Sequence, residues 1–222
     1  NQTEILNYIM SCYNSTDRLF YDVYALLYLD TDFDQTYYPL NTLLEVNCYA
    51  ILSLDLLGNL SLINSQEFID FFWSCYHPDT SGFIGQPYDI SLDSNFLTST
   101  LDNTYYAIHT LDLLMENWGD YSTEKSELIN YINGLEATST WEGKFGGFEN
   151  DGDQSFNSLR MFEPNIESCY YAIKSLEVFH MVDSINTANF YEYLDMLYDN
   201  ETGIFEYSYY HNYDGELDLQ AT

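Results

Sequence analysis

Two short segments of this chain place carboxylate side chains at alternate positions. The first contains Asp30, Asp32 and Asp34, and the second contains Glu149, Asp151 and Asp153. Hard cations such as Ca²⁺ take several oxygen ligands, and short acidic loops supply them. Neither segment continues to the terminal Glu that completes an EF-hand loop, so each also fits an ordinary acidic turn. The chemistry that these residues predict is Ca²⁺ binding, for which the second segment is our candidate.

The charge balance limits the partners of the chain. Its 222 residues include 36 acidic and five basic side chains, for a net charge of −31. Nucleic acids and anionic membranes are disfavoured, because affinity for phosphate comes largely from Lys and Arg. An aromatic content of 18% argues against the disorder that such acidity otherwise indicates. The acidic surface either keeps the protein in solution or binds cations or a basic partner.

Low lysine content, high tyrosine content, acidity and glycosylation signals together favour the cell exterior, whereas the cysteines leave it open. A Cys12–Cys48 or Cys48–Cys75 disulfide fits the sequence as well as free thiols do. Sequons for N-glycosylation begin at Asn1, Asn14, Asn59 and Asn200. No apolar run reaches the ~20 residues that span a bilayer, and a chain that begins with Asn rather than Met is expected to be a processed or excised segment. We therefore predict an extracellular or cell-surface protein.

A recurring phrase indicates the architecture. Tyr49-Ala50-Ile51, Tyr106-Ala107-Ile108 and Tyr171-Ala172-Ile173 each stand in an apolar stretch, and the copies are 57 and 65 residues apart. A fixed phrase at such a period is typical of supersecondary units that stack around one core. An amphipathic stretch follows each copy, and a turn with Gly and then Phe or Ile-Phe ends each unit. Each unit therefore predicts a buried inner helix, a half-exposed outer helix and a loop whose Phe packs into the core.

The repeat count predicts about seven helices in one domain that covers residues 1–222. Residues 3–12 look like an outer helix without an inner helix before it, and Leu217-Asp218 matches the start of another inner helix. The domain is thus expected to begin and end in mid-repeat. Either a longer polypeptide or neighbouring subunits would complete it, because repeat arrays need caps at their ends.

These features resemble the prenyltransferase and squalene-oxidase repeat. The shared motifs are Tyr-Tyr-Ala-Ile on the inner helix, the amphipathic outer helix and loops such as Gly146-Gly147-Phe148 and Ser81-Gly82-Phe83-Ile84-Gly85-Gln86-Pro87. The resemblance covers roughly residues 3–222. It implies an all-α fold, either an α/α toroid or a partial toroid, as in protein prenyltransferase β subunits and class II terpene cyclases. Such motifs specify the fold more than the activity.

The resemblance also implies candidate residues for prenyltransferase chemistry. Glu167-Ser168-Cys169-Tyr170 is similar to the Asp-x-Cys-Tyr motif through which prenyltransferase β subunits bind zinc, with Glu in place of Asp. Glu167 and Cys169 would then be zinc ligands, and Arg160 lies where family members hold the lipid diphosphate. Thr104 occupies the place of Cys169 one repeat earlier, so Cys169 also fits a small core residue. Zinc is less favoured than Ca²⁺ as a cofactor.

Cyclase chemistry has one candidate motif. Asp30-Thr31-Asp32-Phe33-Asp34 is the nearest match to the Asp-x-Asp-Asp acid of class II cyclases and departs from it at the fourth place. Clustered carboxylates can raise one another's pKa, as an acid catalyst requires. Asp30, Asp32 and Asp34 are therefore the candidate catalytic residues.

The sequence favours a non-catalytic function. Few cations are available for a diphosphate, the acid motif is incomplete, and the chain begins and ends in mid-repeat. We expect an exported structural or binding module that contacts a protein partner or assembles with copies of itself. The alternative is a prenyltransferase-like or cyclase-like enzyme that holds an isoprenoid in the centre of the toroid.

Overall fold

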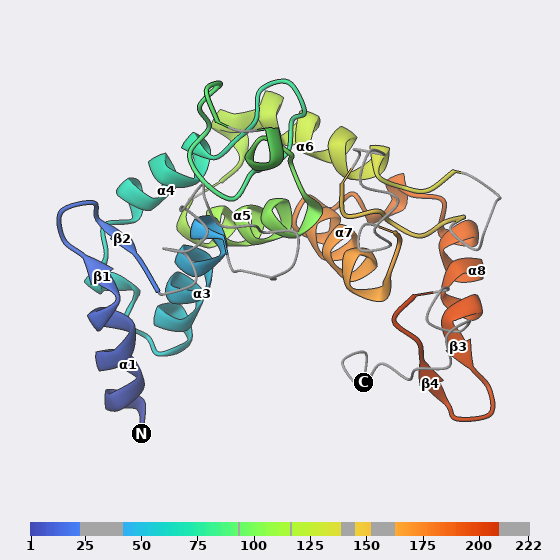
Figure 1. The fold of residues 1–222 in the computed structure, drawn as a ribbon, viewed down its shortest axis with the longest axis horizontal. Helices are drawn as coiled ribbons and strands as arrows, with labels where there is room; N and C mark the ends of the chain where they lie inside the picture. Colours follow the sequence, from blue (N-terminus) through green and yellow to red (C-terminus); the bar gives the residue numbers. More distant parts are fainter. Residues whose placement is uncertain (23–41, 93, 116, 139–144, 152–162, 209–222) are drawn as a thin grey trace.

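The helices of this chain form an arch of two layers (Figure 1). The structure, a computed structural model, describes residues 1–22, 42–92, 94–115, 117–138, 145–151 and 163–208. These residues contain the α-helices α1 (Gln2–Ser11), α3 (Leu43–Leu56), α4 (Ser65–Ser74), α5 (Leu101–Leu114), α6 (Ser122–Gly134), α7 (Ile166–Val178) and α8 (Thr187–Leu197). The described part of the chain therefore confirms the prediction of about seven helices.

The inner layer consists of α3, α5 and α7, which lie side by side along the inside of the arch (Figure 1). The outer helices α4 and α6 cover the opposite side of this layer, and α1 and α8 stand at the two ends. Between the layers lies one core that includes Ile51, Ile108 and Leu176 from inner helices and Phe72 and Leu128 from outer helices, all fully buried. Burial of this apolar surface is the main source of stability.

Polar side chains fix where the helices begin. Thr42 and Glu45 form a reciprocal capping box at the start of α3, and Asn165 and Ser168 form one at the start of α7. Each box satisfies two backbone N–H groups that have no partner within the helix. These caps fix where α3 and α7 begin, and with it which of their side chains face the inside of the arch.

Outer helices return to the inner layer through loops of one design. Strands β1 (Tyr13–Asn14) and β2 (Leu19–Phe20) pair after α1, and β3 (Tyr198–Asp199) and β4 (Ile204–Phe205) pair after α8. Single antiparallel bridges take their place after α4 and α6, at Tyr76–Phe83 and Glu136–Phe148. The remaining short elements are 3₁₀ turns at Leu60–Leu62, Ser94–Phe96, Gly119–Tyr121 and Val182–Ser184.

The prediction that the loop Phe packs into the core holds for Phe83 and Phe148, which are fully buried, but not for Phe205. Phe205 is 38% exposed. The buried rings are covered by the inner helix that follows each of them. No inner helix follows Phe205 within the described residues.

Glycine supplies the left-handed turn of these loops in only part of the repeats. The residue two places before the Phe has a positive φ in every loop: Arg18, Ser81, Gly146 and Gly203. Gly82, which the sequence suggested for this position, serves a different purpose. A Cβ on Gly82 would lie 2.7 Å from Cζ of Tyr131 on the next outer helix, so glycine lets adjacent repeats pack closely.

Candidate functional site

Five tyrosines on the inner helices form a continuous aromatic surface, which we call the tyrosine shelf. Its members are Tyr49 of α3, Tyr105 and Tyr106 of α5, and Tyr170 and Tyr171 of α7. The rings of Tyr49 and Tyr106 meet edge to face at 5.0 Å, and those of Tyr105 and Tyr171 stack at 4.7 Å. Tyr49 is 39% and Tyr170 is 52% exposed. The shelf therefore presents aromatic faces and edges on the side of the inner helices away from the core.

Hydroxyl groups link the shelf across all three inner helices. The hydroxyl of Tyr49 donates to that of Tyr106 at 2.8 Å, and the hydroxyls of Tyr106 and Tyr171 lie 3.4 Å apart. Tyr171 in turn donates to Oε1 of Glu167 at 2.7 Å. Burial raises the pKa of Tyr49 and of Tyr171, and neighbouring tyrosines raise it further. These phenols stay neutral, and each remains a hydrogen-bond donor.

Three carboxylates lie one helical turn before the shelf and form what we call the carboxylate row. They are Glu45, Asp102 and Glu167, each four residues before a shelf tyrosine and each in the first turn of its helix. A helix N-terminus favours negative charge, and this offsets part of the repulsion between them. Oε2 of Glu167 also accepts from the hydroxyl of Tyr207 at 3.1 Å.

Crowding of these carboxylates changes how they ionise. Burial and, after it, the negative charge of Asp102 raise the pKa of Glu45 to about 7, although hydrogen bonds from Thr42 oppose the shift. Burial likewise raises the pKa of Asp102, although hydrogen bonds from Thr100, Asn103 and Asn150 lower it in part. Glu45 therefore exchanges its proton near neutral pH and can act as an acid or as an anion.

Basic side chains in the described residues are already engaged. Lys174 is the only Lys or Arg of the inner helices, and its Nζ bonds Glu177 one turn further along α7. Arg18 pairs with Glu67, and the ammonium of Lys125 lies over the ring of Phe179. Lys144 and Arg160, the diphosphate candidate, lie outside the described residues.

Cys169 takes part in the core of the repeat. Its Sγ accepts a hydrogen bond from the backbone N–H of Phe148 at 3.5 Å, as Oγ1 of Thr104 does from Phe83 at 3.0 Å. One repeat earlier, Oδ1 of Asn47 accepts from the N–H of Phe20 at 2.8 Å. The three side chains hold equivalent positions and fix the Phe of the preceding loop.

Glu167 and Cys169, as they lie, do not fit a zinc centre. Burial raises the pKa of the Cys169 thiol to about 12, so in the absence of a metal this side chain is a neutral thiol. Both oxygens of Glu167 accept hydrogen bonds from tyrosines, whereas Cys169 faces Phe148.

All four cysteines of the chain are free thiols, so of the two alternatives for Cys12, Cys48 and Cys75 the structure has the unbridged one.

The other predicted sites are only partly described. Asp30, Asp32, Asp34 and Asp153 lie outside the described residues. Asp151 is buried at 3% exposure and Glu149 is partly buried. Within the described ranges, no three His, Cys, Asp or Glu side chains are grouped so that they could hold a metal ion. Ca²⁺ binding by the second acidic segment remains a prediction.

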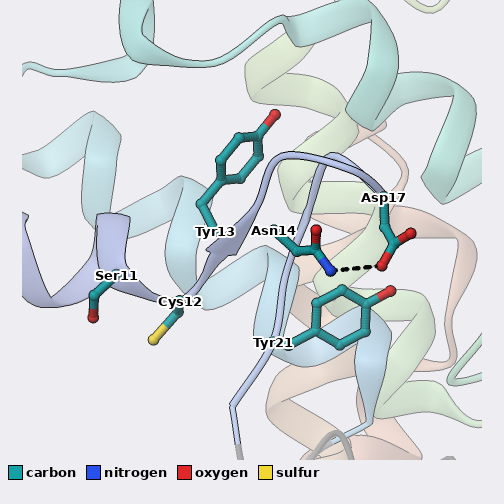
Figure 2. Close-up of a pocket in the computed structure, with 6 residues that line it drawn as sticks. All are labelled: Ser11, Cys12, Tyr13, Asn14, Asp17 and Tyr21. Atoms are coloured by element: carbon teal, nitrogen blue, oxygen red, sulfur yellow. Dashed lines mark hydrogen bonds between the residues drawn. The ribbon is translucent and has the colours of Figure 1, made fainter.

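A separate hollow lies at the N-terminal end of the arch (Figure 2). It has a volume of about 380 Å³, and its lining comprises Ser11, Cys12, Tyr13, Asn14, Asp17 and Tyr21. Nδ2 of Asn14 donates to Oδ2 of Asp17 at 2.8 Å, while burial and the charge of Asp17 raise the pKa of Tyr21. The hollow is open and contains none of the predicted site residues.

The tyrosine shelf was missed in the sequence, although a signal for it was present. In each copy of the phrase an acidic residue precedes by four positions the Tyr that stands before Ala, at Glu45, Asp102 and Glu167. Residues four apart share one face of a helix, so this spacing places the two side chains together. Because the phrase also predicts a buried inner helix, the sequence alone does not separate its exposed tyrosines from buried ones.

Comparison with known proteins gives the family. The family model described as the prenyltransferase alpha-alpha toroid domain matches residues 24–204. Among 18 matching chains of solved structures is one of Candida albicans protein geranylgeranyltransferase-I complexed with GGPP, with a TM-score of 0.63 and 18% identity. The alignment covers 94% of this chain and 55% of that chain, so this chain spans about half the length of its structural neighbour. A search of curated proteins gives no match.

Three predictions can be judged at this point. The all-α fold and the likeness to the toroid repeat are both confirmed. None of the helices in the described residues is long and apolar enough to cross a membrane, as expected. The matched region includes all three inner helices, and the chain belongs to the prenyltransferase alpha-alpha toroid domain family.

Proposed function

We propose that this chain is a non-catalytic binding module of the toroid family and that the tyrosine shelf is its binding surface. The observation that carries this proposal is the shelf itself, in which five tyrosine rings from three helices are in contact and partly open to solvent. Tyrosine suits recognition, because each ring offers a large apolar area together with a polar tip.

The charges around the shelf disfavour prenyl transfer. The inner helices carry six carboxylates and one Lys, and that Lys is bonded to Glu177. A lipid diphosphate needs several cations or a metal to offset its charge. The geometry of Glu167 and Cys169 gives zinc no support, so neither requirement of a prenyltransferase is met by these residues.

One observation favours the alternative, a cyclase-like enzyme. Glu45 has a pKa of about 7 beside an aromatic surface, and class II cyclases likewise use a carboxylic acid to protonate an alkene. GGPP, which the C. albicans neighbour contains, is an isoprenoid that such a surface could hold. Glu45 would then be the proton donor, in place of Asp30, Asp32 and Asp34.

The test compares GGPP with geranylgeraniol, which has the same lipid chain without the diphosphate. Intrinsic fluorescence would follow binding, and release of diphosphate or of a cyclic hydrocarbon would be assayed with Mg²⁺ and Zn²⁺ present. We expect neither product and no binding that depends on the diphosphate. Product that disappears in the Glu45→Gln variant would establish the enzyme instead, as would diphosphate-dependent binding lost in Arg160→Ala or Lys174→Ala.

The remaining parts of the proposal rest on the sequence. The sequons support an exported location. The acidic residues at alternate positions support binding of Ca²⁺. Enzymatic removal of N-glycans from the natively expressed protein should lower its mass. An unchanged mass would argue against glycosylation on a secretory route.

A further inference from the structure

We infer that the tyrosine shelf and the carboxylate row together bind an extended, cationic segment of a partner polypeptide. Its Lys or Arg side chains would lie over the tyrosine rings, with their charges directed to Glu45, Asp102 and Glu167. This inference rests on the proposed function, because it names the partner of the same surface.

The rings supply the first half of such a site. Tyr170 is 52% exposed and meets Tyr105 edge to face at 5.8 Å, and Tyr105 stacks on Tyr171. A cation that approaches the face of an aromatic ring is attracted by the electron density there. The neighbouring rings hold one another in place, so little side-chain freedom is lost when a partner binds.

Charge supplies the second half. Each carboxylate of the row lies one turn from a shelf tyrosine, and the bond from Tyr171 to Glu167 shows that the two groups share a face. Lys174 is the only Lys or Arg on the inner helices, and Glu177 holds it. The whole chain carries −31. A basic partner therefore matches the surface locally and is also attracted over distance.

Spacing selects an extended polypeptide. The axes of packed helices lie about 8–10 Å apart, so the first turns of α3, α5 and α7, which carry the carboxylates, repeat at roughly that interval. The rings of Tyr49, Tyr106 and Tyr171 converge between them, with centroids 5.0 Å and 5.8 Å apart. An extended chain advances about 3.3 Å per residue. A cationic side chain at every third residue would therefore meet one carboxylate on each inner helix, across about seven residues in all.

The experiment uses the complete 222-residue chain and a fluorescent peptide, (Lys-Gly-Gly)₃, followed by anisotropy. Two peptides serve as comparisons: one groups its three lysines before six glycines, and the other is (Glu-Gly-Gly)₃. The shelf variant combines Tyr170→Ala with Glu167→Gln. The matched control combines Tyr198→Ala in strand β3 with Glu201→Gln in the turn that follows it, where both side chains are also exposed. The two variants remove the same groups and the same charge from different faces.

We expect saturable binding of the spaced peptide, weaker binding of the grouped peptide and none of the acidic peptide. The shelf variant should weaken binding about ten-fold, because it removes one cation–π contact and one charge pair. The control variant should leave binding unchanged. Equal weakening in both variants, or equal binding of both basic peptides, would show non-specific attraction to an acidic protein and overturn the inference. Neither result would affect the proposed function, which fails only if the GGPP assay gives product or diphosphate-dependent binding.

Discussion

At the scale of single residues, Cys169 shows how position within the repeat decides the role of a reactive group. Its thiol accepts the N–H of Phe148, at the place where Thr104 accepts the N–H of Phe83. We expect Cys169→Thr to keep the stability of the protein. Cys169→Val, which has the same shape as Thr but no acceptor, should cost about 1–3 kcal/mol, because a buried N–H loses its partner. Urea unfolding of both variants measures this difference.

Thr104→Val is the matched control, and it should cost a similar amount for the same reason. Metal analysis of the native chain, washed with EDTA and reconstituted, tests the zinc prediction directly. One zinc per chain that is lost in Cys169→Thr would contradict the structural role of this residue.

Glu45 should make the stability of the fold depend on pH. Its pKa is about 7 in the folded chain against an ordinary value of 4.5, so the folded state binds the proton more tightly than the unfolded state. The stability from this group is complete below about pH 4.5 and is lost as the pH rises through 7. Glu45→Gln keeps the capping bond and avoids the charge. It should stabilise the protein by about 2 kcal/mol at pH 8 and have little effect at pH 4.

Glu177→Gln gives the opposite control. Lys174 lowers the pKa of Glu177, so this substitution should reduce stability at neutral pH, and the difference should fade as the pH falls below the ordinary range. Denaturant unfolding between pH 4 and pH 8 measures both variants. A stability difference for Glu45→Gln that does not change with pH would contradict the raised pKa.

Sequence reasoning reached the repeat but not the site at this scale. The recurring phrase indicates which residues of different repeats are equivalent, and it correctly identifies Cys169 as the equivalent of Thr104. The raised pKa of Glu45 comes first from its burial and then from the charge of Asp102, which is 57 positions away in the sequence. No local pattern reports a contact of this kind, because it arises only when adjacent repeats pack.

At the scale of elements, the ends of the inner helices offer a test of backbone strain. Gly58 after α3 and His180 after α7 hold equivalent positions, and both have positive φ, at 69° and 57°. The backbone N–H of Gly58 donates to the backbone carbonyl of Asp55, and that of His180 donates to the backbone carbonyl of Glu177. A residue with a Cβ is strained in this conformation. His180→Gly should therefore stabilise the protein by about 0.5–1 kcal/mol.

Gly58→Ala is the reverse experiment. A Cβ at Gly58 would meet no atom within 4 Å, so any loss reflects the backbone alone. We expect a loss of about 1 kcal/mol, measured by thermal unfolding beside His180→Gly. Stability that falls in His180→Gly would mean that the exposed imidazole makes a favourable contact that outweighs the strain.

The elements themselves were largely predictable. Apolar residues at helical spacing gave the layers, and Gly-Phe turns gave the loops. The left-handed turn at Ser81 could not be predicted, because the sequence offers Gly82 beside it. Glycine is required at position 82 because the ring of Tyr131 on the next outer helix leaves no space there for a Cβ.

At the scale of the whole molecule, the arch leaves apolar side chains exposed at both ends. Helices α1 and α8 stand at the two ends of the arch (Figure 1). Ile5 and Tyr8 of α1 are 51% and 68% exposed, and Tyr191 of α8 is 66% exposed. The outer helices within the arch instead bury such side chains against their neighbours, as Phe72 and Leu128 show. Different surfaces at the two ends favour a head-to-tail contact, which closes into a ring or extends into a filament.

We therefore expect the mass of the 222-residue chain in solution to rise with concentration, measured by light scattering at moderate salt that screens its charge. Tyr8→Asp and Tyr191→Asp should each give a monomer, because each removes one of the two surfaces that meet. A mixture of these two variants is the sharper test. Each variant keeps one intact end, and the two intact ends are complementary, so the mixture should form dimers and stop there. A chain that stays monomeric at every concentration, or a mixture that forms no dimer, would contradict head-to-tail assembly.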